Sequence, residues 1–214
     1  MTYQQPDPAG RFEVQRVRSA TQPTGILGEA IRKSLHLLVA FVPLLSSINL
    51  PGTVALLGVG TLFYTFAELS RRNGNTILVV SNLTLLASRD RDRGRFVLGP
   101  ITLALGAMIS LLLYPEPAAS IAIYALAFGD GLASLVGTVI RGPQIPLLKG
   151  KTLSGSSACF IAVFAVTFKI TQRPVESLVV AGSATVLEGI PTGNFDNLMV
   201  PVGVGLVASR LLLG

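Results

Sequence analysis

An acidic residue, Asp130, lies in the middle of a long apolar run, within the sequence Phe128-Gly129-Asp130-Gly131. A charge inside a membrane-spanning segment is costly unless it is paired, hydrated or bound to a metal, so such a residue is a candidate for function. The two neighbouring glycines permit a break in the helix or the close approach of a ligand. We therefore interpret Asp130 as a catalytic residue. The alternative is a buried carboxylate that an arginine of a neighbouring helix holds in place.

Three more acidic residues lie where apolar runs end or begin. Glu68 ends one run three residues before Arg71, so the two share a helix face, and taken alone they are well explained by a local ion pair. Glu188 ends a later run, and Asp196-Asn197 opens the next one. Asp196 also suits the N-cap of that helix. These carboxylates form a common site only if the fold brings them to one side of the membrane.

A segment rich in lysine, glycine and hydroxyl groups precedes a further apolar run. Its two ammonium groups, two glycines and four hydroxyls belong to Lys149, Gly150, Lys151, Thr152, Ser154, Gly155, Ser156 and Ser157. Lysines and the backbone amides at a helix N-terminus both favour anions, so this composition favours the binding of a polyphosphate. A solvated positive loop with Ser and Thr caps is the alternative interpretation.

The elements that must position these residues are those of a membrane protein. The chain has 214 residues, of which 50% are hydrophobic and 13% charged, and its mean hydropathy is +0.63. This composition is too apolar for an ordinary soluble enzyme and excludes intrinsic disorder. The one cysteine, Cys159, excludes an intramolecular disulfide. The net charge of +6 fits basic flanks of apolar segments at anionic headgroups better than it fits nucleic-acid binding.

We predict an all-α fold, that of a polytopic membrane protein with about seven transmembrane helices. The apolar runs lie at residues 35–50, 53–69, 96–114, 118–140, 153–170, 175–190 and 198–213. Residues 75–88 are also apolar but short, so we expect a re-entrant or interfacial helix there, with an eighth crossing as the alternative. Residues 1–28 are expected to form a flexible basic cytoplasmic arm, and residues 29–214 a single transmembrane catalytic domain.

The basic residues orient this arrangement in the membrane. With seven spans and a cytoplasmic N-terminus, all of the 17 Lys and Arg residues except Lys169, Arg173 and Arg210 fall on the cytoplasmic side, as the positive-inside rule requires. The three boundary carboxylates then also come to the cytoplasmic side, with Asp130 about ten residues, or roughly 15 Å, deeper. We therefore expect an integral membrane protein whose active site faces the cytoplasm.

Taken together, the motifs resemble those of the dolichol kinase and phytol kinase family, which includes CTP-dependent diacylglycerol kinases and is related to phosphatidate cytidylyltransferases. The resemblance covers residues 32 to 202 and rests on short motifs in matching order: Arg32-Lys33-x-x-His36, Glu68-x-x-Arg71, Gly129-Asp130-Gly131-x-Ala133-x-x-x-Gly137, Gly150-Lys151-Thr152-x-x-Gly155-Ser156, and Glu188 followed by Asp196-Asn197-Leu198. It implies a CTP-dependent kinase that phosphorylates a membrane lipid alcohol of the polyprenol, phytol or diacylglycerol type, with Mg²⁺ or another divalent cation.

The resemblance also implies roles for individual residues. The catalytic set is Asp130, Lys151, Glu188 and Asp196, and its three carboxylates are the expected metal ligands. The expected nucleotide-binding or substrate-binding set is Lys149, Gly150, Thr152, Ser154, Gly155, Ser156, Asn197, Glu68, Arg71, Arg32, Lys33 and His36. The residues leave open whether Asp130 binds a metal or acts as the base on the lipid hydroxyl.

Two other functions stay open at this point. A CDP-lipid synthase of the phosphatidate cytidylyltransferase type shares the topology, the metal and the nucleotide. A small transporter would also carry carboxylates within the membrane, but such proteins often show duplicated halves, and the chain has no convincing internal repeat. The expected partners are a membrane lipid and a nucleoside triphosphate, without nucleic acid, and the oligomeric state is open, with a homodimer among the options.

The charge distribution predicts that the loop at Gly150 and the C-terminal end of the chain lie on opposite sides of the membrane. In a Cys159→Ala background, a cysteine placed at Gly150 should react with a membrane-impermeant maleimide only from the cytoplasmic side. A cysteine added after Gly214 should react only from the other side. Labelling of both cysteines from the same side would contradict the seven-span topology.

Overall fold

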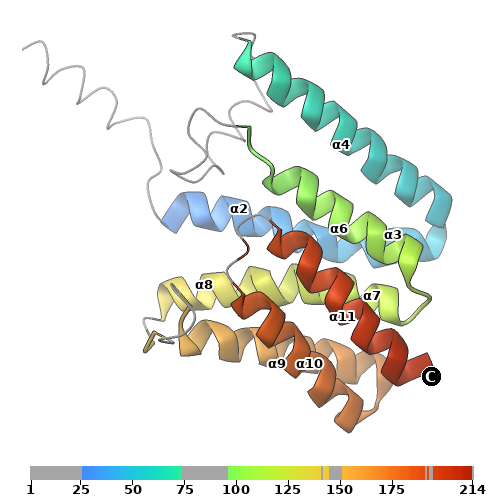
Figure 1. The fold of residues 1–214 in the computed structure, drawn as a ribbon, viewed down its shortest axis with the longest axis vertical. Coiled ribbons are helices and arrows are strands. Elements are labelled where there is room, and N and C mark those ends of the chain that lie inside the picture. The colour runs from blue at the N-terminus through green and yellow to red at the C-terminus, as the bar shows by residue number, and fades with distance from the viewer. Residues whose placement is uncertain are drawn as a thin grey trace, which may run out of the picture.

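The computed structural model describes residues 26–73, 96–140, 142–144, 151–190, 192 and 195–213. Apart from an isolated bridge between Gln144 and Thr152, the regular structure in this described part is helical (Figure 1). The elements are α2 (Ile26–Leu38), the 3₁₀ helix η1 (Val39–Phe41), α3 (Val42–Ile48), α4 (Leu50–Arg72), α6 (Gly99–Leu113), α7 (Ala118–Tyr124), the π-helix η3 (Ala125–Asp130), α8 (Gly131–Val139), α9 (Leu153–Thr171), α10 (Pro174–Gly189) and α11 (Asp196–Leu213).

Each of the seven predicted apolar runs is helical, which confirms the prediction of an all-α fold. Among the described residues, three helical segments are long and apolar enough to cross a membrane, namely Leu50–Arg71, Ala118–Val139 and Leu153–Thr171. The chain is a helical membrane protein. The helix predicted at residues 75–88 lies outside the described residues, as does most of the arm predicted at residues 1–28. Residues 26–28 belong to α2 and not to the arm.

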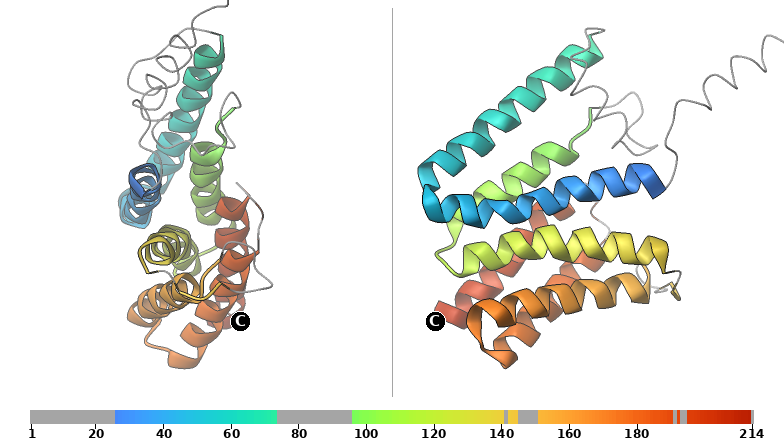
Figure 2. Two further views of the ribbon diagram at one scale, coloured as in Figure 1. Left: turned by 90° about the vertical axis from the view of Figure 1, so that its left-hand side faces the viewer. Right: turned by 180° about the vertical axis from the view of Figure 1, so that it is seen from behind.

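The helices form two layers that cross at an angle. One layer contains α2 to α3, α7 to α8, and α9, and the other contains α6, α10 and α11, with α4 packed on the outer side of α6 (Figures 1 and 2). Successive helical segments run in opposite directions through the bundle (Figure 1). This up-and-down path brings the start of α2, the end of α8 and the starts of α6, α9 and α11 toward the same end of the molecule.

Short connections with defined caps produce this alternation. Asn49 caps α4, because its side-chain oxygen accepts a hydrogen bond of 2.9 Å from the backbone N–H of Gly52. Gln172 ends α9 in the left-handed conformation, with φ of 57°, and Pro174 begins α10 two residues later. Proline suits the first turn of a helix, where its missing N–H costs nothing. Each of these connections reverses the chain within a few residues.

Two apolar clusters hold the layers together. The larger cluster joins α7, α9, α10 and α11 through small and branched side chains such as Ala119, Val163, Val180 and Val204. The smaller cluster joins η1, α3, α6 and the π-helix η3, and includes Leu103 and Leu126. The polar groups described below lie between these clusters and one end of the bundle, so packing fixes their positions.

A glycine sets the distance between α6 and α11. A Cβ atom added at Gly106 would lie 2.1 Å from the backbone oxygen of Asn197, a separation that the two backbones could not keep. Gly106 therefore lets α11 approach α6 closely enough for side chains at the start of α11 to reach the start of α6. Small residues serve the same purpose in many helix pairs within membranes.

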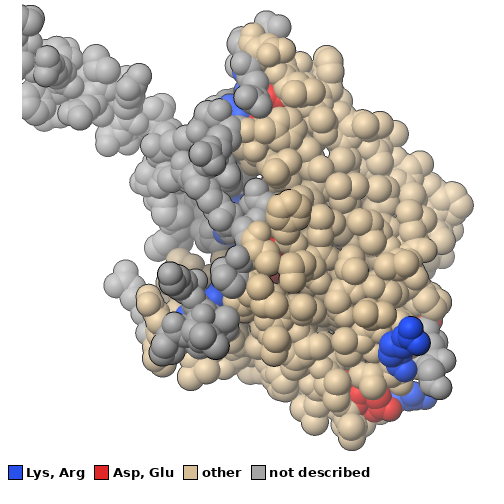
Figure 3. All heavy atoms as spheres, viewed as in Figure 1, with Lys and Arg blue, Asp and Glu red and all other residues tan. Residues whose placement is uncertain are grey.

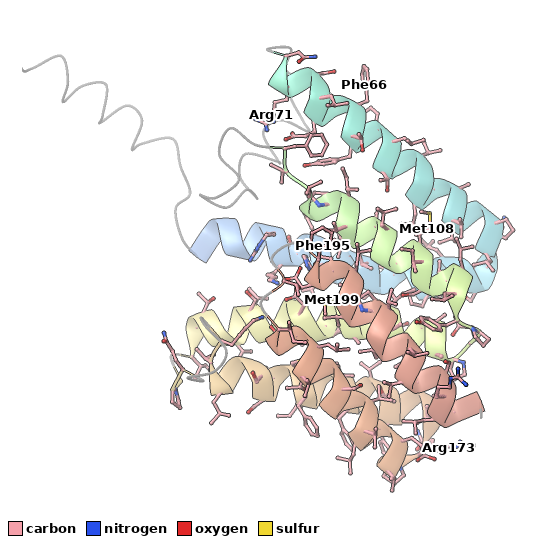
Figure 4. All side chains as sticks on the ribbon, in the orientation of Figure 1. Phe66, Arg71, Met108, Arg173, Phe195 and Met199 are labelled. Atoms are coloured by element: carbon pink, nitrogen blue, oxygen red, sulfur yellow. The ribbon has the colours of Figure 1, made fainter. Side chains whose placement is uncertain are left out.

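The lateral surface of the described part is largely apolar. In Figure 3 most of the visible described face is uncharged, and charged side chains show at the bottom right corner, where Figure 4 labels Arg173, and along the left-hand side up to the corner where it labels Arg71. The outer helix α4 exposes large apolar side chains, and Phe66, which is 64% exposed, points away from the bundle (Figure 4). A surface of this kind is stable against lipid chains and not against water.

The role of Gly106 predicts a large difference between two glycine substitutions. Gly106→Ala should lower the free energy of unfolding by about 1–3 kcal/mol, because a methyl group is forced against the backbone of α11. The matched control is Gly58→Ala in α4, where an added Cβ atom meets nothing within 4 Å and should change stability little or raise it. Thermal unfolding of both variants in detergent measures the difference, and equal midpoints would contradict the close approach.

Candidate active site

Asp130 ends a π-helical turn inside the segment that runs from α7 to α8. The π-helix η3 interrupts the α-helix without breaking it, and Asp130 is 6% exposed. The predicted helix break is therefore a local widening of the turn, a feature that is frequent at functional sites. A Cβ atom at Gly129 would lie 3.1 Å from Val163 and 3.3 Å from the sulfur of Cys159. The missing side chain at Gly129 therefore makes room for α9 and not for a ligand.

The carboxylate of Asp130 is paired with two residues of α2. Lys33 Nζ lies 2.6 Å from Asp130 Oδ2 and also donates a hydrogen bond of 3.2 Å to the backbone oxygen of Asp130. His36 Nε2 lies 2.9 Å from the same Oδ2. Lys33 is 2% exposed, so the pair is desolvated, and such a pair is strongly destabilised when either partner is removed. The alternative interpretation of Asp130 named an arginine of a neighbouring helix as its partner, and the structure has a lysine and a histidine in that position.

The two oxygens of this carboxylate have different surroundings. The contacts from Lys33 and His36 both go to Oδ2. No hydrogen bond from the described residues engages Oδ1. Oδ1 is also not one of the polar atoms that are both fully buried and without a partner. The arrangement therefore holds Asp130 by one oxygen and leaves the other able to accept a proton or a hydrogen bond from an incoming group.

A second ion pair lies on the neighbouring helices α9 and α10. Lys151, just before α9, donates to Oε1 of Glu188 near the end of α10. Glu188 is 3% exposed, and its other oxygen, Oε2, is buried without a hydrogen-bond partner in the described part of the chain. The hydroxyl of Ser156, one turn into α9, is buried in the same unsatisfied state. Buried polar atoms without partners are rare and call for a ligand or water.

The two ion pairs lie on either side of α9. Cys159 of α9 packs against Gly129, the neighbour of Asp130, and Lys151 just before α9 pairs with Glu188 of α10. The structure therefore brings Asp130, Lys151 and Glu188 of the predicted catalytic set into one region of the bundle.

Other members of the predicted phosphate segment have structural contacts. Thr152 is the N-cap of α9, with its hydroxyl accepting from the N–H of Gly155 at 3.2 Å. Ser154 donates to the backbone oxygen of Ile140 at 2.8 Å and so ties α9 to the end of α8. A Cβ atom at Gly155 would lie 2.7 Å from the backbone oxygen of Ala133, so this glycine serves close packing. Lys149 and Gly150 lie outside the described residues.

Glu68 and Arg71 form the local ion pair that the sequence offered as an alternative to substrate binding. The guanidinium of Arg71 donates to both carboxylate oxygens of Glu68, at 2.7 and 2.6 Å. Glu68 Oε1 also accepts from the backbone N–H of Val97 at 3.0 Å, and Tyr64 donates to the backbone oxygen of Val97 at 3.2 Å. These contacts hold the end of α4 against the residues that lead into α6.

The predicted three-carboxylate metal site is not assembled in the structure. The described residues contain no group of three or more His, Cys, Asp or Glu side chains placed to hold one metal ion. Asp130 is occupied by Lys33 and His36, and Asp196 lies at the start of α11, where its carboxylate accepts from the N–H of Asn197 at 2.9 Å. The unengaged Oε2 of Glu188 still fits a hard cation, because Mg²⁺ commonly uses one or two carboxylates together with phosphate oxygens and water.

Asn197 and His36 meet in a contact that the sequence did not predict. His36 Nε2 lies 3.1 Å from Asn197 Oδ1, and the amide nitrogen of Asn197 lies 2.9 Å from the hydroxyl of Thr102 on α6. His36 Nδ1 lies 3.2 Å from the backbone oxygen of Arg32. Sequence reasoning missed Thr102, because a threonine in an apolar helix usually bonds its own backbone and gives no signal of its partner.

The desolvated pair of Lys33 and Asp130 predicts strong coupling between the two residues. Lys33→Met should lower the free energy of unfolding by about 3–5 kcal/mol, because it leaves a buried carboxylate without its ammonium partner. The double variant Lys33→Met with Asp130→Asn should be more stable than the sum of the two single losses predicts. Lys169→Met, at an exposed lysine near the end of α9, is the matched control and should unfold like wild type. Additive losses in detergent-solubilised protein would contradict the pairing.

Comparisons with known proteins give one informative similarity. The chain is 28% identical over 142 residues to a Triticum aestivum protein named "Probable phytol kinase, chloroplastic", and the match covers 58% of this chain and 47% of that protein. The chain thus spans about half the length of the curated relative that it matches. No protein-family model matches the chain. No solved structure matches it either.

Proposed function

We propose that this protein is a membrane-embedded kinase that transfers the γ-phosphoryl group of CTP to the hydroxyl of a long-chain lipid alcohol. The observation that carries the proposal is the buried carboxylate of Asp130, which is held by Lys33 and His36 through one oxygen while the other oxygen stays unengaged. A positioned carboxylate of this kind can orient a hydroxyl and accept its proton. A site within an apolar helix bundle suits a substrate whose tail remains in the bilayer.

The similarity to the wheat protein supports the same reaction class. That protein's name describes a kinase that acts on phytol, a lipid alcohol. The motif order from Arg32 to Leu198 resembles the dolichol kinase and phytol kinase family. The pairing of Lys151 with Glu188 and the packing of Gly129, the neighbour of Asp130, against α9 support a common site for three of these motifs. The polyprenol, phytol and diacylglycerol types of alcohol are all candidates for the substrate.

The reaction step uses Asp130 as the acceptor of the proton. The lipid hydroxyl bonds to Asp130 Oδ1, its oxygen attacks the γ-phosphorus, and its proton passes to the carboxylate. The bond between the γ-phosphorus and the bridging oxygen breaks, and CDP leaves with the electron pair. Positioning and charge stabilisation supply most of the catalysis in phosphoryl transfer, so little further chemistry is asked of the protein.

The second ion pair supplies the charges for the triphosphate. Lys151 is paired with Glu188 and is only partly buried, so its ammonium group can turn to a phosphate oxygen. The buried hydroxyl of Ser156 has a free donor for the same anion. Glu188 would hold a divalent cation such as Mg²⁺, which neutralises the charge of the triphosphate, and its unengaged oxygen supports this role.

The path of the chain supports seven crossings with the site toward the cytoplasm. The contacts of Glu68 and Tyr64 with Val97 show that the chain leaves α4 and enters α6 at the same end of the bundle. The segment between Asn73 and Phe96 is too short to cross a bilayer twice, since one crossing needs about 20 apolar residues. The seven helical segments then cross in alternation, with the basic residues Arg71 and Lys151 on the proposed cytoplasmic side.

The fate of labelled phosphorus tests the reaction. Purified protein with CTP, Mg²⁺ and a panel of phytol, polyprenol and diacylglycerol should move γ-label, and not α-label, into a lipid product and release CDP, and chelation of the metal should stop the transfer. Lys151→Ala should reduce kcat by about a hundredfold, because one preorganised charge is lost from the transition state. The control Lys169→Ala, at the opposite end of α9, should keep the wild-type kcat.

Recovery of α-label in the lipid together with pyrophosphate would overturn the kinase and identify a CDP-lipid synthase. Full activity of Lys151→Ala would exclude the proposed phosphate site. Faster transfer from ATP or GTP than from CTP would correct the nucleotide and leave the reaction class unchanged.

A further inference from the structure

His36 lies at the centre of a buried hydrogen-bond chain that links four elements. Its ring contacts Asp130 on the π-helix η3 and Asn197 on α11, and Asn197 in turn contacts Thr102 on α6. All four side chains of this chain are buried, and Asn197 is 4% exposed. We call this hydrogen-bonded series of four side chains, Thr102, Asn197, His36 and Asp130, the relay.

The direction of the hydrogen bonds in the relay follows from the backbone oxygen at its α6 end. The backbone oxygen of Gly99 can only accept, and it lies 3.3 Å from Asn197 Nδ2, so the amide nitrogen of Asn197 faces α6. The amide oxygen, Oδ1, must then face His36, 3.1 Å away. Both Oδ1 of Asn197 and Oδ2 of Asp130 are acceptors, so His36 Nε2 carries a proton and donates to them.

We infer that His36, oriented by Asn197 and Thr102, is a positioning residue that fixes the carboxylate of Asp130 for the transfer step. The inference rests on the proposed kinase function and deepens it. Lys33 neutralises the carboxylate, but an ammonium group on a flexible stem does not select one orientation of the carboxylate plane. A rigid imidazole ring that Asn197 holds in place does select one orientation of the carboxylate plane, and it leaves Oδ1 turned to the substrate.

This role differs from the one that the sequence motifs implied. Asn197 and His36 were expected to bind nucleotide or substrate, but each of their polar side-chain atoms has a polar atom of the protein within hydrogen-bond distance. Among the described residues, the hydroxyl of Thr102 accepts from Asn197 and donates to the backbone oxygens of Leu98 and Gly99, so its link to His36 and Asp130 runs through Asn197. A change at Thr102 should therefore alter the rate of the chemical step and not the affinity for nucleotide.

The single histidine of the chain gives the relay a spectroscopic readout that is independent of activity. In the full chain, labelled with ¹⁵N-histidine and held in detergent or nanodiscs, the ring nitrogen resonances report His36 alone. Asn197→Ala and Thr102→Val should shift them, because each removes a contact that orients the ring. Thr102→Ser keeps the hydroxyl and should restore the wild-type spectrum. Thr167→Val is the matched control, because Thr167 is buried and its hydroxyl has no hydrogen-bond partner among the described residues.

Kinetics of the same variants test the consequence for catalysis. Per folded protein, Thr102→Val and Asn197→Ala should lower kcat roughly tenfold or more, within the factor of about 10² to 10⁴ that a positioned base supplies, with the nucleotide KM unchanged. The double variant should be no slower than Asn197→Ala alone, because both act through one chain of contacts. Thr102→Ser and Thr167→Val should keep the wild-type kcat.

Several results would overturn the inference. Unchanged histidine resonances in Asn197→Ala and Thr102→Val would show that the relay does not orient the ring. Shifted resonances with wild-type kcat would show that the orientation does not serve catalysis, and a raised nucleotide KM with unchanged kcat would assign the residues to nucleotide binding. A wild-type chain that phosphorylates no alcohol of the panel would contradict the proposed function and the catalytic role together, while the resonances would still decide whether the relay exists.

Discussion

The pairing of the Asp130 carboxylate with Lys33 is the interaction on which the arrangement of the bundle depends. A carboxylate in an apolar interior costs several kcal/mol unless an opposite charge accompanies it, so α2 must lie against the π-helix η3 closely enough for Lys33 to reach. Gly129 presents no side chain to α9, so α9 packs closely against η3 as well. The charge therefore dictates helix positions that apolar packing alone would leave free, since lipid chains and leucine side chains are equally apolar.

Packing between small residues then places the remaining polar groups. Gly106 lets the backbone of α11 approach α6, and as a result Asn197 spans the gap between Thr102 and His36. On the other side of α9, close contact with α10 buries Glu188 beside Lys151. The proposed proton acceptor, Asp130, and the proposed phosphate-binding charges of Lys151 and Glu188 thus lie on opposite sides of α9. Such a separation suits a reaction in which a lipid hydroxyl and a nucleotide approach from different directions.

Particular residues show how far sequence reasoning reaches. The apolar runs were predicted correctly because hydropathy and length are local properties, and all seven are helical. The bond between Glu68 and Arg71 was foreseen as an alternative because both residues lie on one helix. Lys33, by contrast, was predicted on the cytoplasmic side of the first span and in the nucleotide-binding or substrate-binding set, whereas it is almost fully buried against Asp130. Its partner is 97 residues away, and no local pattern carries that information.

The sequence by itself determined that the chain is a helical membrane protein and that Asp130, Lys151 and Glu188 are its most unusual charges, because composition and the cost of burying charge depend on residue type alone. Only the tertiary structure decided which charges neutralise one another. It assigned Thr152, Ser154 and Gly155 to caps and packing, and it joined Thr102 to His36 through Asn197. Among the described residues it gathered no three His, Cys, Asp or Glu side chains into one metal site. The physical reason is that hydrogen bonds and ion pairs act over about 3 Å, and distances on that scale between separate helices follow from the packing of the whole bundle.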